Sequence, residues 1–328
     1  MKSGLFRIVL KAIKVIVIAV VSLLLILFLL PYIIPGTISQ KIKTFVNRSI
    51  DGKIEFSKAR LSFFNHFPSL TLTLYDFSST GSAPFQNEKL LSAGEIAMGI
   101  RIPALLRGEI KINEFYVSNA DINVHVNEKG EANYNVYKSS ASSDTSSSAD
   151  TTTHLKLEKI VIENSNLVYN DLSSDVLIRA QRLNYAGKGD LSKAIFDLTS
   201  HISVDSFDLY YAGEPYILKR KIRADLLTSI NTNSLAFEFR NNKLRINRLP
   251  IECIGRYEFL KKGYQMNFEF KSVNAQLADI FTVLPPSYQG WLGKTQMEGS
   301  AALRFAIGDT FTPWKWQRYV PYQQSAGD

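Results

Sequence analysis

Cysteine and histidine are the scarcest reactive residues in this chain. The 328 residues include one cysteine, Cys253, and four histidines, none of which pairs with another at metal-ligand spacing. One thiol cannot form an intramolecular disulfide, and by itself it cannot build a thiolate metal site. Cys253 stands between apolar neighbours, which is more typical of a small buried residue than of a nucleophile. The sequence therefore predicts no disulfide, metal or cofactor.

The signatures of common enzyme classes are also missing. The chain has no G-x-S-x-G nucleophile elbow, no phosphate-binding loop, no glycine-rich dinucleotide fingerprint and no H-E-x-x-H zinc motif. Acidic residues are scattered, and His125 falls on the polar side of an alternating segment. Without a cluster of acid, base or nucleophile, we expect a protein that is not an enzyme.

The charge is modest and has no nucleic-acid pattern. The formal net charge is +8, and Lys2, Arg7, Lys11 and Lys14 supply half of it at the N-terminus. No basic run interleaved with aromatic residues follows, so a nucleic-acid partner is not expected. Apolar residues make up 45% and charged residues 21%, enough apolar material for a buried core.

One long hydrophobic run lies near the N-terminus. No charged residue occurs between Lys14 and Lys41, and residues 15–34 are long enough, as a helix, to cross a hydrocarbon core of about 30 Å. No small-x-small cleavage site follows, so a retained anchor is favoured over a signal peptide. We predict a basic cytoplasmic segment at 1–14 and a transmembrane anchor at 15–35. The positive charges before the run place the remainder of the chain outside.

An amphipathic helix is predicted directly after the anchor, at 36–51. Apolar residues recur there at helical spacing, and Asp51-Gly52 is a good C-terminal stop. This helix either lies on the membrane surface or covers one end of the domain that follows.

From residue 52 the apolar period changes to two, which is typical of strands with one apolar face. Leu70-Thr-Leu-Thr-Leu74 alternates strictly. Further strands are expected at 110–126, 155–169, 196–211, 222–230, 235–240, 244–254 and 264–270. Turn signals between them are Gly81, Gly108, Gly130, Gly187, Gly213 and Asn241-Asn242, and short helices are expected near 103–107 and 274–284.

Composition divides this β part into regions. Residues 139–153 are almost entirely Ser, Thr, Ala and Asp, and we expect a disordered loop because they carry no large apolar side chain. It separates a first β region at 52–138 from a second at 154–309. Residues 310–328 lose the strand alternation and form an atypical tail.

An internal repeat links the two β regions. Residues 110–124 match residues 155–169 at a constant offset of 45. In both copies the apolar residues change twice between odd and even positions, first before Phe115 or Ile160 and again around Asn119 or Asn164. Because asparagine tolerates left-handed backbone geometry, each copy is predicted to be strand, bend, strand, turn, strand. Repeats that each expose an apolar face must stack to bury it, which favours an elongated sheet.

A series of short motifs follows the hydrophobic run in a fixed order. They are Gly52-Lys53-Ile54, Phe67-Pro68, Asp76-Phe77, Ala83-Pro84-Phe85, Leu90-Leu91, Leu105-Leu106 with Gly108, Asn119 with Asp121-Ile122, and Asn127 with Gly130 and Asn133. In this order they resemble the N-terminal region of AsmA-type proteins of Gram-negative envelopes, above all the Bacteroidetes versions. The resemblance covers residues 52–137 well, and general β-repeat character extends to Gly299.

The resemblance implies a mainly β protein in which a curved antiparallel sheet forms a groove with an apolar lining, as in chorein-like lipid-transfer proteins. It implies an inner-membrane anchor, a periplasmic β domain, and phospholipid transport for outer-membrane biogenesis and envelope homeostasis. The alternative is an anchored, non-enzymatic interaction protein that affects the assembly or targeting of outer-membrane proteins through envelope protein partners.

The candidate groove lining consists of the apolar alternates in the strands. These are Leu70, Leu72, Leu74, Phe115, Val117, Ile122, Val124, Ile160, Ile162 and Leu167. The same side chains suit the core of a closed sheet equally well. Family members usually continue through more β repeats, so a truncation or an altered reading frame is the expected explanation of the tail.

Overall fold

The structure, a computed structural model, describes residues 52–62, 69–101, 112–135, 157–260, 264–288 and 298–311, together with Lys14, Val15, Ile18 and Ser22. In these segments, strands dominate and belong to one 13-stranded sheet. The strands are β1 (Ile54–Glu55), β2 (Lys58–Ser62), β3 (Leu70–Thr80), β4 (Lys89–Ile100), β5 (Ile112–Val126), β6 (Lys159–Asp171), β7 (Val176–Gly189), β8 (Ile195–Tyr211), β9 (Glu214–Asn231), β10 (Ala236–Ile246), β11 (Leu249–Phe259), β12 (Tyr264–Gln276) and β13 (Ser300–Phe311).

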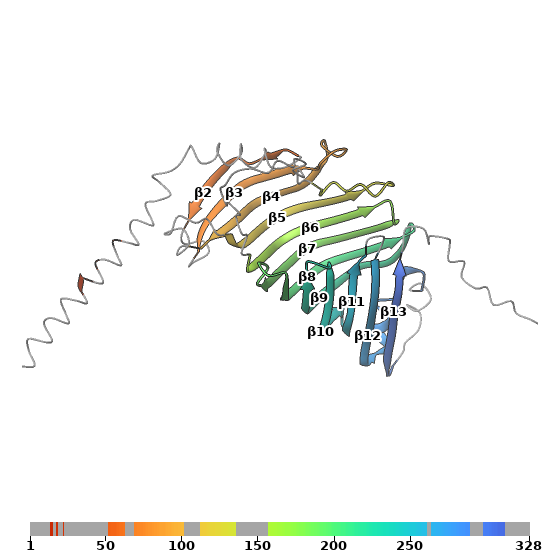
Figure 1. The fold of residues 1–328 in the computed structure, drawn as a ribbon. Helices are drawn as coiled ribbons and strands as arrows, with labels where there is room; N and C mark the ends of the chain where they lie inside the picture. The colour runs from red at the N-terminus through yellow and green to blue at the C-terminus, as the bar shows by residue number, and fades with distance from the viewer. Residues whose placement is uncertain are drawn as a thin grey trace, which may run out of the picture.

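The sheet is a long, twisted and curved ribbon in which sequence neighbours are also spatial neighbours (Figure 1). From β3 to β13 each strand pairs with the next, while β1 and β2 both pair with the free side of β3. Because the order follows the sequence, the two β regions on either side of the predicted loop form one continuous sheet.

The sheet is mixed, not wholly antiparallel as predicted. β5 and β6 run parallel, and every other pair is antiparallel within the described strands. Phe115 pairs with Ile160 and Ile122 with Leu167, so the register equals the 45-residue offset of the repeat. The two copies thus lie side by side and run in the same direction. The chain between two parallel strands must return to the end at which the first strand begins.

Each repeat copy is one continuous strand with a single left-handed residue, not the five-part unit predicted. Asn119 in β5 has φ 52° and Asn164 in β6 has φ 44°, and Asp76 in β3 has φ 50°. One such residue shifts the alternation by one, so side chains before and after it point the same way. Val117 and Ala120, on either side of Asn119, belong to the same buried cluster.

The left-handed residues are tied together by side-chain hydrogen bonds across the strands. Asn164 Nδ2 donates to Asn119 Oδ1 at 2.7 Å, and Asn184 Oδ1 in β7 accepts from the Asn164 amide at 2.9 Å. On the other side, Ser57 Oγ donates to Asp76 Oδ2 at 2.7 Å. These polar contacts satisfy backbone and side-chain groups where the ladder is distorted.

The motif around Asn127, Gly130 and Asn133 caps the end of β5. Asn127 Oδ1 accepts from the amides of Lys129 and Glu131, and Gly130 has φ 78°. Asn133 is 1% exposed; its amide group donates to the Asn123 carbonyl and accepts from the His125 amide. The buried side-chain amide of Asn133 therefore hydrogen-bonds the backbone of Asn123 and His125 in place of a neighbouring strand.

Several strand boundaries differ from the prediction. β4, β7 and β13 were not predicted, and Gly187 lies inside β7, where the Tyr185 ring covers it, instead of in a turn. The predicted strand at 244–254 is two strands, because Asn247 has φ 52° and turns β10 into β11. Short periodic segments do not reveal such two-residue turns when neither residue is glycine or proline.

One predicted helix lies in the described part of the chain. α4 (Leu277–Phe281) falls within the expected 274–284, whose first residues extend β12. Lys14, Val15, Ile18 and Ser22 are helical and exposed, but among the described residues no helix has the length and apolarity needed to cross a membrane. Lys2, Arg7, Lys11, most of the anchor at 15–35, and the segments 36–51, 103–107, 139–153 and 312–328 lie outside the described residues.

The left-handed conformation of Asn119 gives a direct test of the strand geometry. Asn119→Val places a β-branched residue at positive φ and removes the bond to Asn164, so the free energy of unfolding should fall by about 1–3 kcal/mol. Asn119→Gly, which tolerates positive φ, should lose less. Asn123→Val in the same strand is the control, and thermal unfolding followed by circular dichroism measures all three.

Candidate functional site

One face of the sheet carries a continuous apolar row. Register partners place one side chain from each strand, β3 to β11, along this row. They are Leu74, Ile96, Val117, Ile162, Tyr185, Ile202, Ala224, Leu244 and Ile251. Directly paired residues in a ladder share a face, so the row spans nine neighbouring strands without a charged residue.

All ten residues predicted as groove lining lie on this apolar face. Leu70, Leu74 and Val117 are 3–5% exposed. The other seven are half-buried: Leu72, Phe115, Ile122, Val124, Ile160, Ile162 and Leu167. Tertiary structure therefore brings the predicted residues together, but divides them between a closed and a more open part of the face.

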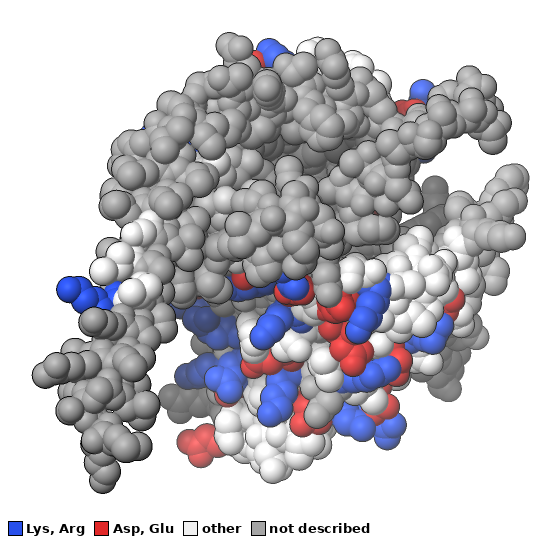
Figure 2. All heavy atoms as spheres, turned by 60° about the vertical axis from the view of Figure 1, so that its left-hand side comes forward, with Lys and Arg blue, Asp and Glu red and all other residues white. Residues whose placement is uncertain are grey.

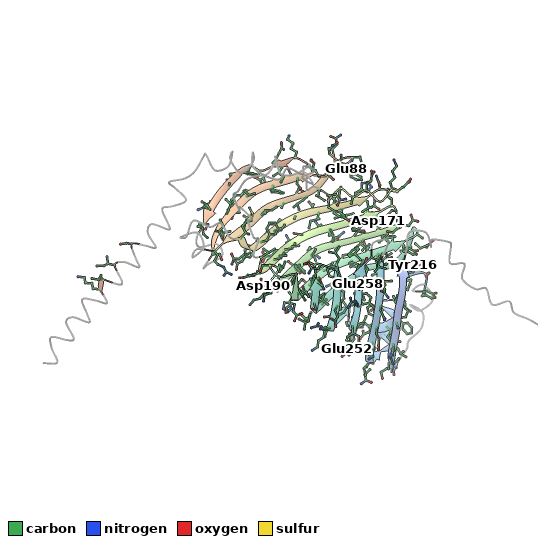
Figure 3. The ribbon with its side chains drawn as sticks, viewed as in Figure 1. Glu88, Asp171, Asp190, Tyr216, Glu252 and Glu258 are labelled. Carbon is green, nitrogen blue, oxygen red and sulfur yellow. The ribbon has the colours of Figure 1, made fainter. Side chains whose placement is uncertain are left out.

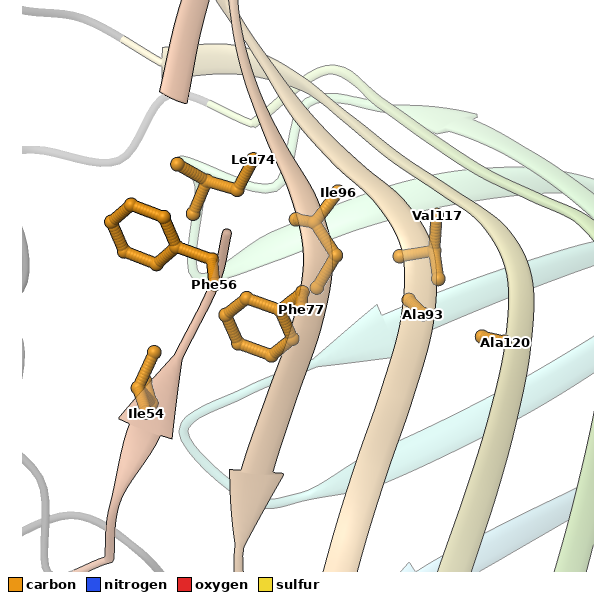
Figure 4. Close-up of a cluster of buried hydrophobic side chains, with 8 residues drawn as sticks. All are labelled: Ile54, Phe56, Leu74, Phe77, Ala93, Ile96, Val117 and Ala120. Carbon is orange, nitrogen blue, oxygen red and sulfur yellow. The ribbon is translucent and has the colours of Figure 1, made fainter. Parts of the chain in front are cut away.

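The N-terminal part of the face is a packed core. Its buried cluster consists of Ile54, Phe56, Leu74, Phe77, Ala93, Ile96, Val117 and Ala120, which gather on one side of the first strands (Figure 4). Phe77 and Ala93 stand opposite each other on β3 and β4, so small and large residues interdigitate. In β1 to β5, these side chains therefore pack against one another as a buried cluster.

Towards β13 the face opens and becomes aromatic. Phe239 lies 5.3 Å from Phe268 between ring centroids, and Phe270 lies 6.2 Å from Phe305. Leu303 and Phe305 are 40% and 59% exposed. The sequence reading overlooked these aromatic residues as lining, although alternate aromatics such as Phe237 and Phe239 were the available signal.

The apolar face is concave. Tyr169 in β6 interacts electrostatically with Tyr257 in β11, and Asp171, labelled at the end of β6 in Figure 3, interacts with Tyr264 in β12. In a flat sheet, strands five or six positions apart would be separated by about 24 Å or more. The twist and curl of the ribbon must therefore bring these ends of the face towards each other.

The opposite face is charged. Register partners there place His201, Asp225, Lys243, Glu252, Lys271 and Arg304 in one row across β8 to β13. Figure 2 shows basic and acidic side chains interspersed over the described part of the surface in view. The His201 Nδ1 to Asp225 Oδ1 distance is 2.6 Å, but both side chains are more than 60% exposed, so the pair adds little stability.

Two hollows lie among these charged side chains. One of about 640 Å³ is bordered by His201, Arg223 and Asp225, and another of about 400 Å³ by Arg223, Lys243 and Glu252. Within the described ranges, no group of three or more His, Cys, Asp or Glu is placed to hold a metal ion. The charged side chains around both hollows can form ion pairs with the charged groups of a ligand or partner.

The single cysteine belongs to the apolar face. Cys253 in β11 pairs with Phe270 in β12 and with Asn242 in β10, and its side chain is half-buried. Burial raises the pKa of the Cys253 thiol. The thiolate that nucleophilic chemistry needs is therefore disfavoured, in keeping with the prediction of a small buried residue.

Fold and site together define a class: a repeating, curved β-sheet with a concave apolar face and a charged outer face. A sequence model of the AsmA family matches residues 1–251, and the chain belongs to this family. No curated protein and no solved structure shows a significant match to the chain.

The gradient of burial along the face predicts unequal costs for the same truncation. Leu74→Ala removes a side chain that is 4% exposed and should lower the free energy of unfolding by roughly 2–5 kcal/mol. Leu303→Ala, at 40% exposure on the same face, should lower it by less than about 1 kcal/mol. Urea denaturation of both variants measures the difference; equal costs would contradict an open C-terminal face.

Tyr169 predicts a loss of stability in alkali. Burial and the neighbouring Asp171 carboxylate raise the pKa of Tyr169 from 10.0 to about 12. The folded chain holds this proton more tightly than the unfolded chain, so stability should fall as the pH rises from 10 towards 12. Tyr169→Phe should fall less steeply than the wild type in unfolding experiments across this range, whereas exposed Tyr288→Phe should follow the wild type.

Proposed function

We propose that the concave apolar face binds phospholipid acyl chains and that the protein passes them towards the outer membrane without chemical change. The observation that carries this proposal is the apolar row across nine strands. The row is buried at β3 to β5, and from β6 onwards every member except Ala224 is only half-buried. Exposed apolar surface of this extent is unfavourable in water and marks a binding surface for apolar groups.

The energetics suit acyl chains. Each methylene transferred from water to an apolar surface contributes about 0.8 kcal/mol, so a chain lying along several strands is retained without specific polar contacts. The partly exposed aromatic side chains near β13 extend this surface, and their flat rings accept flexible chains in many positions. Headgroups then stay in water at the open side of the face.

The cellular setting in this proposal is the inner membrane and the periplasm. The uncharged run at 15–34 supplies an anchor, and Lys2, Arg7, Lys11 and Lys14 before it place the N-terminus in the cytoplasm. Membership of the AsmA family supports a role in outer-membrane biogenesis and envelope homeostasis. No nucleic acid, metal or cofactor takes part.

A second candidate rests on the charged face. The row from His201 to Arg304 mixes acidic and basic residues over six strands, a pattern that selects partners by charge complementarity. On this proposal the protein is an anchored regulator of outer-membrane protein assembly or targeting. It predicts binding that depends on ionic strength and that does not involve the apolar face.

Cys253 is a built-in reporter for the lipid proposal. The full chain is purified in non-ionic detergent, then incubated with or without phospholipid, and the rate at which a water-soluble maleimide modifies Cys253 is followed by mass spectrometry. Lipid on the apolar face should cover the thiol and slow the modification severalfold, because the reagent must reach a half-buried sulfur beside Phe270.

The matched control moves the thiol to the other face. In the double variant Glu252→Cys, Cys253→Ser, the thiol lies on the exposed charged face one residue away, and lipid should not change its rate of modification. Equal protection at both positions would indicate non-specific coating. No protection at Cys253, together with no co-purifying phospholipid, would reject lipid binding and favour the second candidate.

A further inference from the structure

Arg220 is a charged residue on the apolar face. It lies in β9 between Lys219 and Lys221, which are exposed, whereas Arg220 is half-buried. Its Nε atom is buried and has no hydrogen-bond partner. Within the described part of the chain, no ion pair involves its guanidinium either. A buried donor on a permanent cation is costly unless an acceptor meets it, so this position calls for an explanation.

Two independent registers place Arg220 on the apolar side. It pairs directly with Phe207 of β8, which itself pairs with buried Ala180 of β7. Arg220 also stands two residues before Ile222, whose partner Val204 is 5% exposed. Direct partners and alternate residues of a strand share a face, so both relations agree.

The backbone is bent to hold this orientation. Lys219 has φ 51°, and its amide donates to Asp208 Oδ1 at 2.6 Å. The left-handed residue shifts the alternation, so that both Ile217 and Arg220 point towards the apolar face. Without the shift, either Arg220 or the apolar residues before it would face the charged side.

The neighbouring carboxylates on β8 are already engaged. Asp205 Oδ2 accepts from Arg182 Nε at 2.8 Å, and Asp208 binds the Lys219 amide. Among the described residues, the guanidinium of Arg220 is therefore left without a counter-ion.

Arg220 lies at a step in the sheet. β9 pairs with β10 only as far as Ile222, opposite Ile246, and Asn247 Oδ1 then accepts from the Lys221 amide at 3.0 Å. Beyond this step, towards the β8–β9 turn, Tyr211 and Tyr216 pack edge to face at 6.1 Å between ring centroids. Tyr216 is labelled in Figure 3. The guanidinium thus stands at the margin between the apolar row and an amphipathic, partly exposed aromatic pair.

We propose that Arg220 binds the anionic headgroup of an amphiphile whose apolar chains lie on the same face. This inference rests on the proposed lipid-binding function and adds a preference for a negatively charged headgroup. A guanidinium presents parallel donors that match the oxygens of a phosphate or carboxylate, and both groups are its usual partners. Chains then extend from Phe207 along the row that includes Ile202 and Ala224.

The test captures the amphiphile beside Arg220 and excludes lipid around the anchor. Phe207, the direct partner of Arg220, is replaced by the photo-crosslinker p-benzoylphenylalanine in the full chain in non-ionic detergent. The protein is equilibrated with equal amounts of phosphatidylglycerol and phosphatidylcholine bearing the same acyl chains, irradiated and analysed by mass spectrometry. Both headgroups carry a phosphate, but the choline cation of phosphatidylcholine offsets its charge, so phosphatidylglycerol should be captured about tenfold in excess.

Two substitutions separate this site from general electrostatics. Arg220→Gln keeps the length of the side chain, removes the charge, and should bring the two lipids close to equal capture. Lys221→Gln removes the same charge from the adjacent exposed position and should keep the wild-type preference. Thermal unfolding should show Arg220→Gln at least as stable as the wild type in lipid-free detergent, because a half-buried cation whose Nε has no partner is removed.

The outcomes are distinguishable. Equal capture of both lipids in the wild type, or a preference that persists in Arg220→Gln, would overturn the role of Arg220 while leaving lipid binding intact. A loss of preference in Lys221→Gln alone would assign the effect to the surface charge. Capture of neither lipid, with no protection of Cys253, would reject the proposed function itself. A parallel incubation with oleate separates carboxylate from phosphate recognition.

Discussion

The left-handed backbone conformation, which most residues avoid, keeps one face of this sheet apolar and the other polar. A long strand in a curved sheet must bend, and a bend that adds a residue reverses which side chains face inwards. Left-handed Asp76, Asn119 and Asn164 absorb the bend and restore the alternation, so that apolar side chains stay on one face along the whole strand. Hydrogen bonds between Asn119, Asn164 and Asn184 fix the bends of neighbouring strands to each other.

The closed and open parts of the apolar face follow from the same geometry. At β3 to β5, alanine residues lie among leucine, isoleucine, valine and phenylalanine, which lets side chains interdigitate into a core. At β10 to β13, aromatic residues follow one another across the strands and remain partly exposed. An apolar surface that the described sheet does not cover is suited to a ligand. Arg220 places a cationic group at the margin of this surface.

Within the described strands, the opposite face differs from the apolar face by its many charged side chains. Basic and acidic residues pair across strands from β8 to β13, for example Arg304 with Glu269 at 2.9 Å. Exposed pairs of this kind contribute little stability, but they keep the outer face hydrated. They therefore favour the arrangement in which this face, and not the apolar face, is turned towards water. The contrast between the faces, more than any single residue, gives the fold its proposed use.

The sequence by itself determined the strand periodicity, the 45-residue repeat and the ten apolar residues of one face, because alternation is a local property of the extended chain. It also indicated Asn119 and Asn164 as special positions. Only the tertiary structure decided that the repeat copies pair in parallel, that 244–254 contains a turn, and that Arg220 faces inwards. Register and burial depend on contacts between distant segments, and the sequence does not encode those contacts locally.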